Sequence, residues 1–366
     1  MPTKEDLMQR QALPLRAKVL MSQIRIREWF HHFSGDVYIS FSGGKDSTVL
    51  AHLVREVFPD VPIVFADTGL EYPEIRKFAK EKGAEFVKPK MGFAEVISKY
   101  GYPIISKEIS GQIACARAIR GNNPRFTGYH RADFLGERIW NGKSAYNKEK
   151  WLTLCQESQF MVSDRCCYVM KKTPLHTYER KTGRFPYVGT LTEESQLRKQ
   201  AWLKHGCNSF DGKKKTSQPM SFWREQDVLQ YIKENSIEIA SVYGDIVNVG
   251  DDGFQYEETL LGESRLKCTG CQRTGCIFCG YGAHLEKGET RFQRLSRTHP
   301  KQYEYCIGGG QWVDNPKYDP SVPEYDGKWK NWNPKKIWVP SKHGLGMGKV
   351  FDDLNQMYGK DFIRYD

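Results

Sequence analysis

The chain has 366 residues, of which 39% are apolar and 13% aromatic, a composition that excludes a disordered chain and can supply a sizeable core. Lys and Arg total 55 against 44 Asp and Glu, so the formal charge of +11 favours anionic partners: nucleotides, sulfated or phosphorylated small molecules, or nucleic acid. No apolar run approaches the roughly 18 residues of a membrane span, and no signal peptide is visible. We therefore expect a cytoplasmic protein without a membrane partner.

The first part of the chain alternates strand and helix patterns. Residues 1–34 form a predicted N-terminal helical segment, because apolar residues recur at helical spacing over 15–33. Strands are then predicted at 36–41, 62–66 and 85–87, and helices at 48–58 and 72–82. This alternation predicts a parallel sheet covered on both faces, with the loops after the first two strands at one edge.

The rest of the chain is less regular. Residues 107–165, rich in Arg, Gly and Asn, predict an insertion or lid. A further strand is expected over 183–190, and helices over 193–204 and 227–234. We therefore expect an α/β domain over 35–250, followed by a Cys-rich segment and tail over 251–366.

A glycine-containing loop joins the first strand to its helix. The loop consists of Ser42, Gly43, Gly44, Lys45, Asp46 and Ser47. Its glycines allow close approach of a phosphate, the following helix offers unpaired N–H groups, and Lys45 adds positive charge. Its glycine spacing is not that of the Walker A motif. A phosphate loop is favoured over a turn without a ligand. For Asp46, the alternative to a catalytic role is that the helix dipole favours an acidic residue at the helix N-terminus.

This loop resembles the PP-loop of the ATP pyrophosphatase superfamily, and five further segments make the chain similar to the phosphoadenosine phosphosulfate reductase family. The segments are Asp67-Thr68-Gly69 with Glu71 and Glu74; Cys166-Cys167 with Lys171, Pro174 and Leu175; Gly189-Thr190 with Glu194, Ser195 and Arg198; Pro219 and Trp223 with Asp227 and Tyr231; and Gly275-Cys276 with Cys279. They occur in the family's order and span residues 36 to about 280.

The resemblance implies a doubly wound parallel α/β sheet that binds an adenine nucleotide, either ATP or an adenosine phosphosulfate. The implied binding residues are Ser42, Gly43, Gly44, Lys45, Asp46, Ser47, Asp67, Thr68, Gly69 and Lys171, with Lys45, Asp46 and Arg198 as catalytic residues. With ATP as the ligand, Mg²⁺ is expected on the phosphates, with Asp67 as a candidate ligand; a turn-forming Asp after a strand is the alternative.

Ten cysteines in a reducing compartment indicate metal, cluster or redox chemistry rather than disulfides. The adenosine phosphosulfate branch of the family implies a [4Fe–4S] cluster on Cys166, Cys167, Cys276 and Cys279. A local zinc site on Cys268, Cys271, Cys276 and Cys279 is one alternative, although the short connection between its halves counts against it, and a chain without a metal is the other. No role is assigned to Cys115, Cys155, Cys207 or Cys306.

One family feature is missing from this sequence. Members that reduce sulfate carry a nucleophilic Cys in a C-terminal Glu-Cys-Gly segment, whereas the last Cys here is Cys306, followed by Ile-Gly-Gly-Gly. We therefore expect sulfur transfer or sulfonucleotide chemistry, with a sulfur or electron donor protein as a possible partner.

Two alternatives remain open. The first is ATP-dependent thiolation of nucleic acid, of the tRNA thiolase or DNA phosphorothioation type. It would explain the net charge and the basic, aromatic stretch 328–338, although burial of that stretch as a wrapped tail is favoured. The second is a non-catalytic nucleotide-binding module with a structural zinc.

Overall fold

The computed structural model describes residues 2–118, 128–138, 147–211, 215–250, 255–256, 265–323, 325, 327 and 329–366. The chain divides into two compact units, each built from two stretches of sequence. Unit 1 comprises Met1–Pro89 and Thr173–Gly275, and unit 2 comprises Lys90–Lys172 and Cys276–Asp366. This division was not predicted, and the expected domain boundaries and the expected lid stay predictions.

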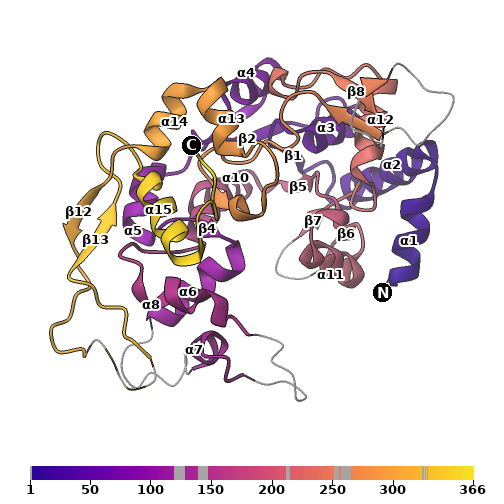
Figure 1. The fold of residues 1–366 in the computed structure, drawn as a ribbon. Coiled ribbons are helices and arrows are strands. Elements are labelled where there is room, and N and C mark those ends of the chain that lie inside the picture. The colour runs from indigo at the N-terminus through magenta and orange to yellow at the C-terminus, as the bar shows by residue number, and fades with distance from the viewer. Residues whose placement is uncertain are drawn as a thin grey trace. The chain divides into compact units, whose positions relative to one another are not determined.

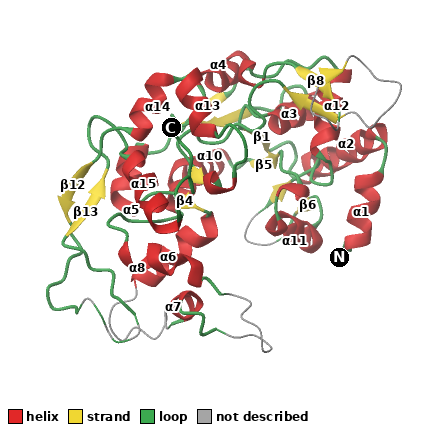
Figure 2. Ribbon diagram, viewed as in Figure 1, coloured by secondary structure: helices red, strands yellow, loops and turns green. Residues whose placement is uncertain are grey.

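Unit 1 contains a six-stranded sheet in the order β3-β2-β1-β5-β7-β6, parallel except for the pair β6–β7 (Figures 1 and 2). Its strands are β1 (Val37–Phe41), β2 (Ile63–Ala66), β3 (Glu85–Val87), β5 (Phe185–Val188), β6 (Asn208–Ser209) and β7 (Thr216–Ser217). Its helices are α1 (Lys4–Ala12), α2 (Leu15–His32), α3 (Lys45–Val57), α4 (Pro73–Glu81), α10 (Thr173–Thr182), α11 (Gln196–His205) and α12 (Glu225–Glu234), with 3₁₀ turns at Thr192–Glu194 and Ser241–Tyr243. A smaller antiparallel sheet, β10-β8-β9, consists of β8 (Ile246–Val249), β9 (Gln255–Tyr256) and β10 (Arg265–Cys268).

Alternate residues of β1 face opposite sides of the sheet, and both sides are covered. Tyr38 packs with Val64 of β2 and Tyr178 of α10, and donates a hydrogen bond to Glu179 (2.9 Å). On the opposite face, Phe41 meets Phe78 of α4. On that face too, the β5 residue Tyr187 donates to the backbone carbonyl of Ile26 in α2 (2.7 Å). The predicted α/β fold with helices on both faces is therefore confirmed.

The predicted strands and helices of unit 1 are confirmed, with two differences. The helix predicted from residue 48 begins at Lys45, so the last three residues of the glycine loop form its first turn. The helix predicted over 193–204 is interrupted at Ser195, whose backbone is extended and whose hydroxyl accepts a hydrogen bond from the Arg198 N–H (3.2 Å). Ser195 is thus the N-cap of α11 rather than a residue inside a helix.

Unit 2 is mainly helical, with two small two-stranded sheets. Its helices are α5 (Phe93–Tyr100), α6 (Lys107–Ala118), α7 (Tyr129–Phe134), α8 (Leu152–Glu157), α9 (Arg165–Cys167), α13 (Arg291–Thr298), α14 (Pro300–Ile307) and α15 (Met347–Tyr358), with 3₁₀ turns at Glu149–Trp151 and Ala283–Leu285 and a π turn at Tyr168–Lys172. Its strands are β4 (Ile104–Ile105), β11 (Gly280–Tyr281), β12 (Gln311–Asp314) and β13 (Lys336–Val339). Within the described residues, no helix of either unit has the length and apolarity needed to cross a membrane.

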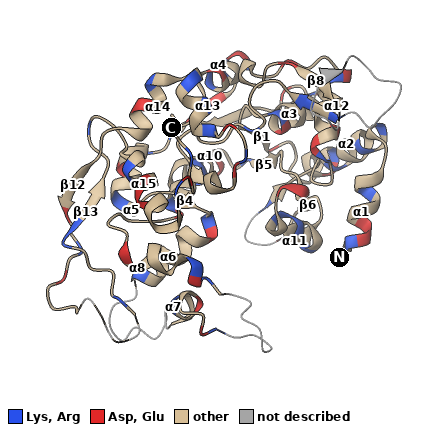
Figure 3. Cartoon of the chain, viewed as in Figure 1, with Lys and Arg blue, Asp and Glu red and all other residues tan. Residues whose placement is uncertain are grey.

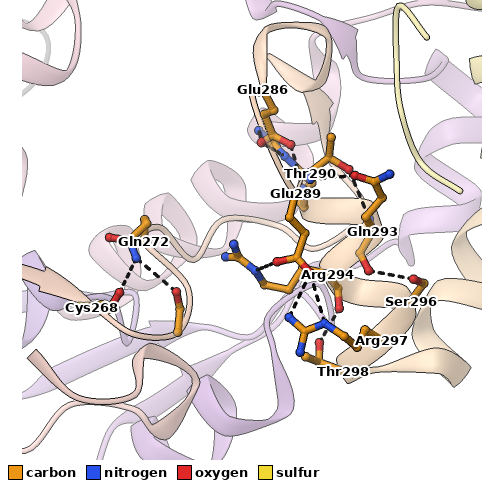
Figure 4. A network of polar contacts seen from close by, with 12 residues as sticks. Cys268, Gln272, Glu286, Glu289, Thr290, Gln293, Arg294, Ser296, Arg297 and Thr298 are labelled. Carbon is orange, nitrogen blue, oxygen red and sulfur yellow. Dashed lines mark hydrogen bonds and ion pairs between the residues drawn. The ribbon is translucent and has the colours of Figure 1, made fainter. Parts of the chain in front are cut away.

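The C-terminal stretch of unit 2 is more ordered than its sequence suggested. A capping box between Thr290 and Gln293 starts α13, and Glu289 pairs with Arg294 and Arg297 on that helix (Figure 4). In the basic, aromatic stretch, Trp329 and Trp332 are 2% and 7% exposed, in agreement with a buried tail; Lys328 lies outside the described residues.

A buried ion pair joins α2 to α12 in unit 1. Lys18 is 2% exposed, and its Nζ lies 2.6 Å from Oδ2 of Asp227. Removing one partner of such a pair leaves an uncompensated buried charge, so we expect Lys18→Met to lower the free energy of unfolding by about 3–5 kcal/mol. Urea denaturation measures this. Lys77→Met, which breaks the exposed pair with Glu81, is the control and should have a much smaller effect.

Candidate functional site

The glycine loop lies where the strand order of the sheet reverses. Strands β2 and β3 extend to one side of β1, and β5 pairs with its other side. Ligands of open parallel sheets bind outside the carboxyl ends of the strands at such a point, and Ser42 follows β1 directly. Gly43 has φ +70°, and a Cβ there would lie 2.6 Å from Cγ2 of Ile75. Both the backbone conformation and the close approach therefore require glycine.

Hydroxyl groups fix the shape of this loop. The Ser47 Oγ accepts a hydrogen bond from the Ser42 N–H (3.2 Å), contacts the Ser42 Oγ (3.1 Å) and donates to the carbonyl of Gly44 (2.9 Å). The Lys45 N–H, in the first turn of α3, donates to the Tyr243 hydroxyl (3.4 Å). A helix N-terminus with N–H groups directed to one place suits an anion, and Tyr243 occupies one of these donors in this structure.

The ammonium group of Lys45 is buried beside the loop. The residue is 6% exposed, its Nζ lies 2.9 Å from Oε1 of Glu225, and it lies 5.6 Å from the centre of the Tyr243 ring. The backbone N–H of Glu225 donates in turn to Glu193 (2.5 Å). A bound phosphate would compete with Glu225 for this ammonium.

Asp46 lies among the charges of this site. The pKa of its carboxyl is raised, and burial is the largest cause of this rise. The nearby carboxylate of Glu225 raises the pKa further, whereas the positive charges of Lys45, Arg273 and Arg198 lower it. Arg198 forms an ion pair with Glu194, which also lies 3.8 Å from Arg273. Lys45, Asp46 and Arg198, the three predicted catalytic residues, therefore lie within electrostatic range of one another, as does Arg273, and their catalytic role stays a prediction.

The raised pKa of Asp46 has a consequence for stability. Folding favours the protonated carboxyl, so the stability that Asp46 contributes is present below its ordinary pKa and is lost as pH rises through the folded pKa. Asp46→Asn, which stays neutral, should therefore melt at a higher temperature than wild type near pH 7, and this advantage should shrink toward about pH 4. Melting curves of both proteins across this range test it; a difference that does not change with pH would contradict it.

Gly189, which follows β5, packs against the same loop. A Cβ on Gly189 would lie 2.9 Å from the carbonyl oxygen of Asp46, so only glycine permits this approach. The Oγ1 of the next residue, Thr190, is buried and has no hydrogen-bond partner within the described residues. A buried hydroxyl without a partner is costly, so the Thr190 hydroxyl, which follows β5 at the point where the strand order reverses, is a candidate to bind a ligand.

The second predicted binding segment follows β2 at the same edge of the sheet. Asp67 is 5% exposed; its Oδ2 lies 2.9 Å from Arg76 Nη2 and 3.9 Å from Lys88 Nζ. The Thr68 hydroxyl donates to Glu71 (2.7 Å), and Gly69 has φ +72°. Asp67 is therefore engaged by cations of its own unit, and its role toward Mg²⁺ stays a prediction.

Four of the cysteines interact within unit 2. The pKa of the Cys166 thiol is raised, mainly by burial, and the neighbouring Cys276, Cys167 and Cys279 raise it further. Burial and Cys276 likewise raise the pKa of Cys279 to about 12. Among the described residues no group of three or more His, Cys, Asp or Glu side chains is arranged to hold a metal ion. The structure therefore brings these four thiols within electrostatic range of one another, but not into a ready metal site.

The remaining predicted residues lie in different surroundings. Lys171 acts on Cys166 in unit 2, where its charge opposes the rise in that thiol's pKa. Cys268 and Cys271 are buried in unit 1, whereas Cys276 and Cys279, the other half of the zinc alternative, belong to unit 2. The charges of Lys45 and Glu225 both act on Cys268, and the Gln272 side chain donates to the Cys268 carbonyl (2.5 Å; Figure 4).

Sequence reasoning missed several residues of this site. They are the buried Thr190 hydroxyl, Glu193, Glu225, Tyr243 and Arg273. Glu225 lies inside the predicted segment between Trp223 and Asp227, which was a usable signal. Nothing in the local sequence marks Tyr243.

Comparisons with known proteins agree with the resemblance seen in the sequence. Residues 36–102 and 136–280 match the model of the phosphoadenosine phosphosulfate reductase domain. An uncharacterized protein of Methanocaldococcus jannaschii is 42% identical over 280 residues, which cover 75% of this chain and 46% of that protein. The phosphoadenosine 5'-phosphosulfate reductase of Serratia proteamaculans is 33% identical over 61 residues, which cover 17% of this chain and 25% of the enzyme.

A solved structure was also found. The crystal structure of phosphoadenylyl-sulfate reductase from Candida auris in complex with phosphate has a TM-score of 0.34 and 13% identity, and the match covers 66% of this chain and 91% of that one. The chain spans less than half the length of the two curated relatives named above.

Proposed function

Because this chain belongs to the phosphoadenosine phosphosulfate reductase family, we propose that it binds an adenine nucleotide on Ser42–Ser47 and acts in sulfur transfer or sulfonucleotide chemistry. The observation that carries the proposal is the loop itself, a glycine turn at the point where the strand order of the sheet reverses. Backbone N–H groups, serine hydroxyls and the Lys45 ammonium are the donors that a polyphosphate requires.

We propose that ATP or an adenosine phosphosulfate is the nucleotide. With ATP, an oxygen of the acceptor would attack the α-phosphorus, forming an O–P bond as the bond to pyrophosphate breaks, and a sulfur nucleophile would then displace AMP. Lys45 and Arg198 would neutralise charge that develops on the phosphates. Mg²⁺ would accompany ATP as the usual partner of such phosphates.

Four cysteines of unit 2 are proposed as ligands of a [4Fe–4S] cluster. The residues are Cys166, Cys167, Cys276 and Cys279, and a set of four thiols fits this group in its donor chemistry. Burial favours the protonated thiols of Cys166 and Cys279, whereas a bound metal favours the thiolates, so loading would release protons. Such a cluster, when bound, supplies electrons or a site for sulfur. Lys171 would hold positive charge beside Cys166.

Thiolation of nucleic acid is the second candidate, supported by the net charge of +11. Lys and Arg are interspersed with Asp and Glu along most helices in Figure 3, so this charge is spread over the chain rather than collected on one element. Binding of tRNA or DNA that weakens steeply with salt would favour this candidate.

The experiment that tests the proposed function is a nucleotide assay on the anaerobically purified chain. The protein is incubated with Mg²⁺ and either ATP or adenosine phosphosulfate, and release of AMP, pyrophosphate and sulfite is followed. Pyrophosphate from ATP indicates activation of an acceptor, and sulfite from the phosphosulfate indicates reduction. Binding of either nucleotide without any product, in the presence of sulfide and a reductant, would instead support a non-catalytic binding module.

A further inference from the structure

A pocket with several charged lining residues lies in unit 2, and its described lining includes none of the predicted nucleotide-binding residues Ser42–Ser47, Asp67–Gly69 and Lys171. This α6 pocket, of about 570 Å³, lies between α6 and the segment Ser163–Lys172. Its described lining residues are Lys107, Gly111, Ala114, Cys115, Ala118, Ser163, Asp164, Arg165, Tyr168 and Lys172. The family model matches residues 36–102 and 136–280, so the whole α6 wall lies outside the matched part of the chain.

The charges of the α6 pocket favour an anion. Lys107, Arg165 and Lys172 are positive, and among the described lining residues only Asp164 is negative. The Cys115 thiol adds no negative charge, because burial and Asp164 raise its pKa, against the opposing charge of Arg165. Flexible cations around one pocket suit the oxygens of a phosphate group.

The wall of the pocket is held in place by hydrogen bonds. The Ser163 hydroxyl accepts from the backbone N–H of Arg165 (3.0 Å), and the Ser163 carbonyl accepts from the Tyr281 hydroxyl (3.3 Å). A Cβ on Gly111 would lie 3.3 Å from Cγ of Asp164, so glycine lets α6 approach this wall closely. The backbone that carries Arg165 and the turn of α6 that faces it are therefore held in place, which lowers the cost of ordering a ligand there.

An aromatic ring accompanies the cations. Tyr168 is 53% exposed, and the Arg165 guanidinium lies 6.0 Å from the centre of its ring. Exposed aromatic rings beside cations are how proteins bind nucleotides of single strands, with the base stacked and the phosphate neutralised. We propose that the α6 pocket binds a nucleotide unit other than the one on the glycine loop, its phosphate on Lys107, Arg165 and Lys172 and its base on Tyr168. This proposal does not depend on the reaction proposed above.

The test compares two charge-reversed proteins with the same net charge. One carries Lys107→Glu and Lys172→Glu in the pocket, and the control carries Lys287→Glu and Lys301→Glu at exposed positions of unit 2 outside it. The probes are uridine monophosphate, followed by calorimetry, and a labelled single-stranded decauridylate, followed by fluorescence anisotropy. The pocket variant should bind both probes at least ~10-fold more weakly than the control, because each charged contact it loses is strong. Equal binding by the two variants, or no binding by wild type, would overturn the proposal.

A third variant distinguishes binding of the base from binding of the phosphate. Tyr168→Ala should weaken uridine monophosphate and leave inorganic phosphate unchanged, whereas the Lys107/Lys172 variant should weaken both. Saturation by the monophosphate alone would identify a free nucleotide as the ligand, and much tighter binding of the decauridylate would identify a nucleic acid strand. If Tyr168→Ala weakens neither nucleotide probe, the base is not stacked there and the proposal fails in that part.

Discussion

Replacing Lys45 with alanine is expected to lower nucleotide-dependent turnover by about 10²–10³-fold while the chain stays folded. Lys45 is 6% exposed and is the first residue of α3, directly after the glycine turn, so its positive charge is fixed beside the expected phosphates. Charge fixed before the reaction stabilises the charge that develops on a leaving pyrophosphate without reorganisation. Pyrophosphate or sulfite release, normalised to protein that is folded by circular dichroism, measures the effect. The matched control is Lys77→Ala in α4, whose side chain is 78% exposed.

Glu225 determines how this result is interpreted. Lys45→Ala leaves the Glu225 carboxylate without the ammonium that lies 2.9 Å away, so a disturbed α12 is the alternative to a lost phosphate contact as the cause of any loss of activity. Glu225→Gln alone should tighten nucleotide binding several-fold, because it releases Lys45 from its ion pair. The double variant Lys45→Ala with Glu225→Gln should be folded and as inactive as the single one. Wild-type turnover in either alanine variant would refute a role for Lys45 in catalysis.

The parts of the site that the sequence predicted are local in the chain. The loop Ser42–Ser47 follows a strand, and its last three residues begin a helix. The strand, the loop and the start of the helix can each be recognised from a few consecutive residues. The pairing of β1 with β5 was not predicted, because these strands are far apart in the sequence and their contact is not local.

The residues that were missed reach the loop from far along the chain. Glu225 lies 180 residues from Lys45, and Tyr243 lies 198 residues from it. Neither contact can be recognised from hydrophobic periodicity or turn chemistry, because both form only in the folded chain; the contact of Glu225, for example, requires α12 to pack against α3. The break at Ser195 was in principle readable, since Ser is a preferred N-cap, but the charged helical pattern around it concealed the boundary.

The cysteines also show that spacing along the sequence does not determine which residues lie together in the fold. The spacing of Cys268, Cys271, Cys276 and Cys279 suggested one local zinc site, yet compact packing assigns the first two to unit 1 and the last two to unit 2. Cys166 and Cys276 are distant in sequence but act on each other inside one unit. Spacing alone therefore does not choose between the two sets, and a measurement on the metal must do so.

Anaerobically purified protein is expected to contain about four iron and four acid-labile sulfide per chain, with a visible brown chromophore. Cys166→Ala and Cys276→Ala should each abolish the chromophore, because each removes a thiol from the interacting set. Cys268→Ala and Cys115→Ala are the matched controls and should keep it, since their thiols are not among those that act on Cys166. Iron, sulfide and zinc analysis beside the visible spectrum makes the measurement.

A single zinc per chain would reverse this assignment. If that zinc were lost with Cys268→Ala and kept with Cys166→Ala, the local site would be correct and the sulfur chemistry would lose its cluster. If no variant changed the metal content, neither set would be a ligand set. The decisive comparison is therefore between Cys166→Ala and Cys268→Ala, because Cys276 and Cys279 belong to both sets and cannot separate them.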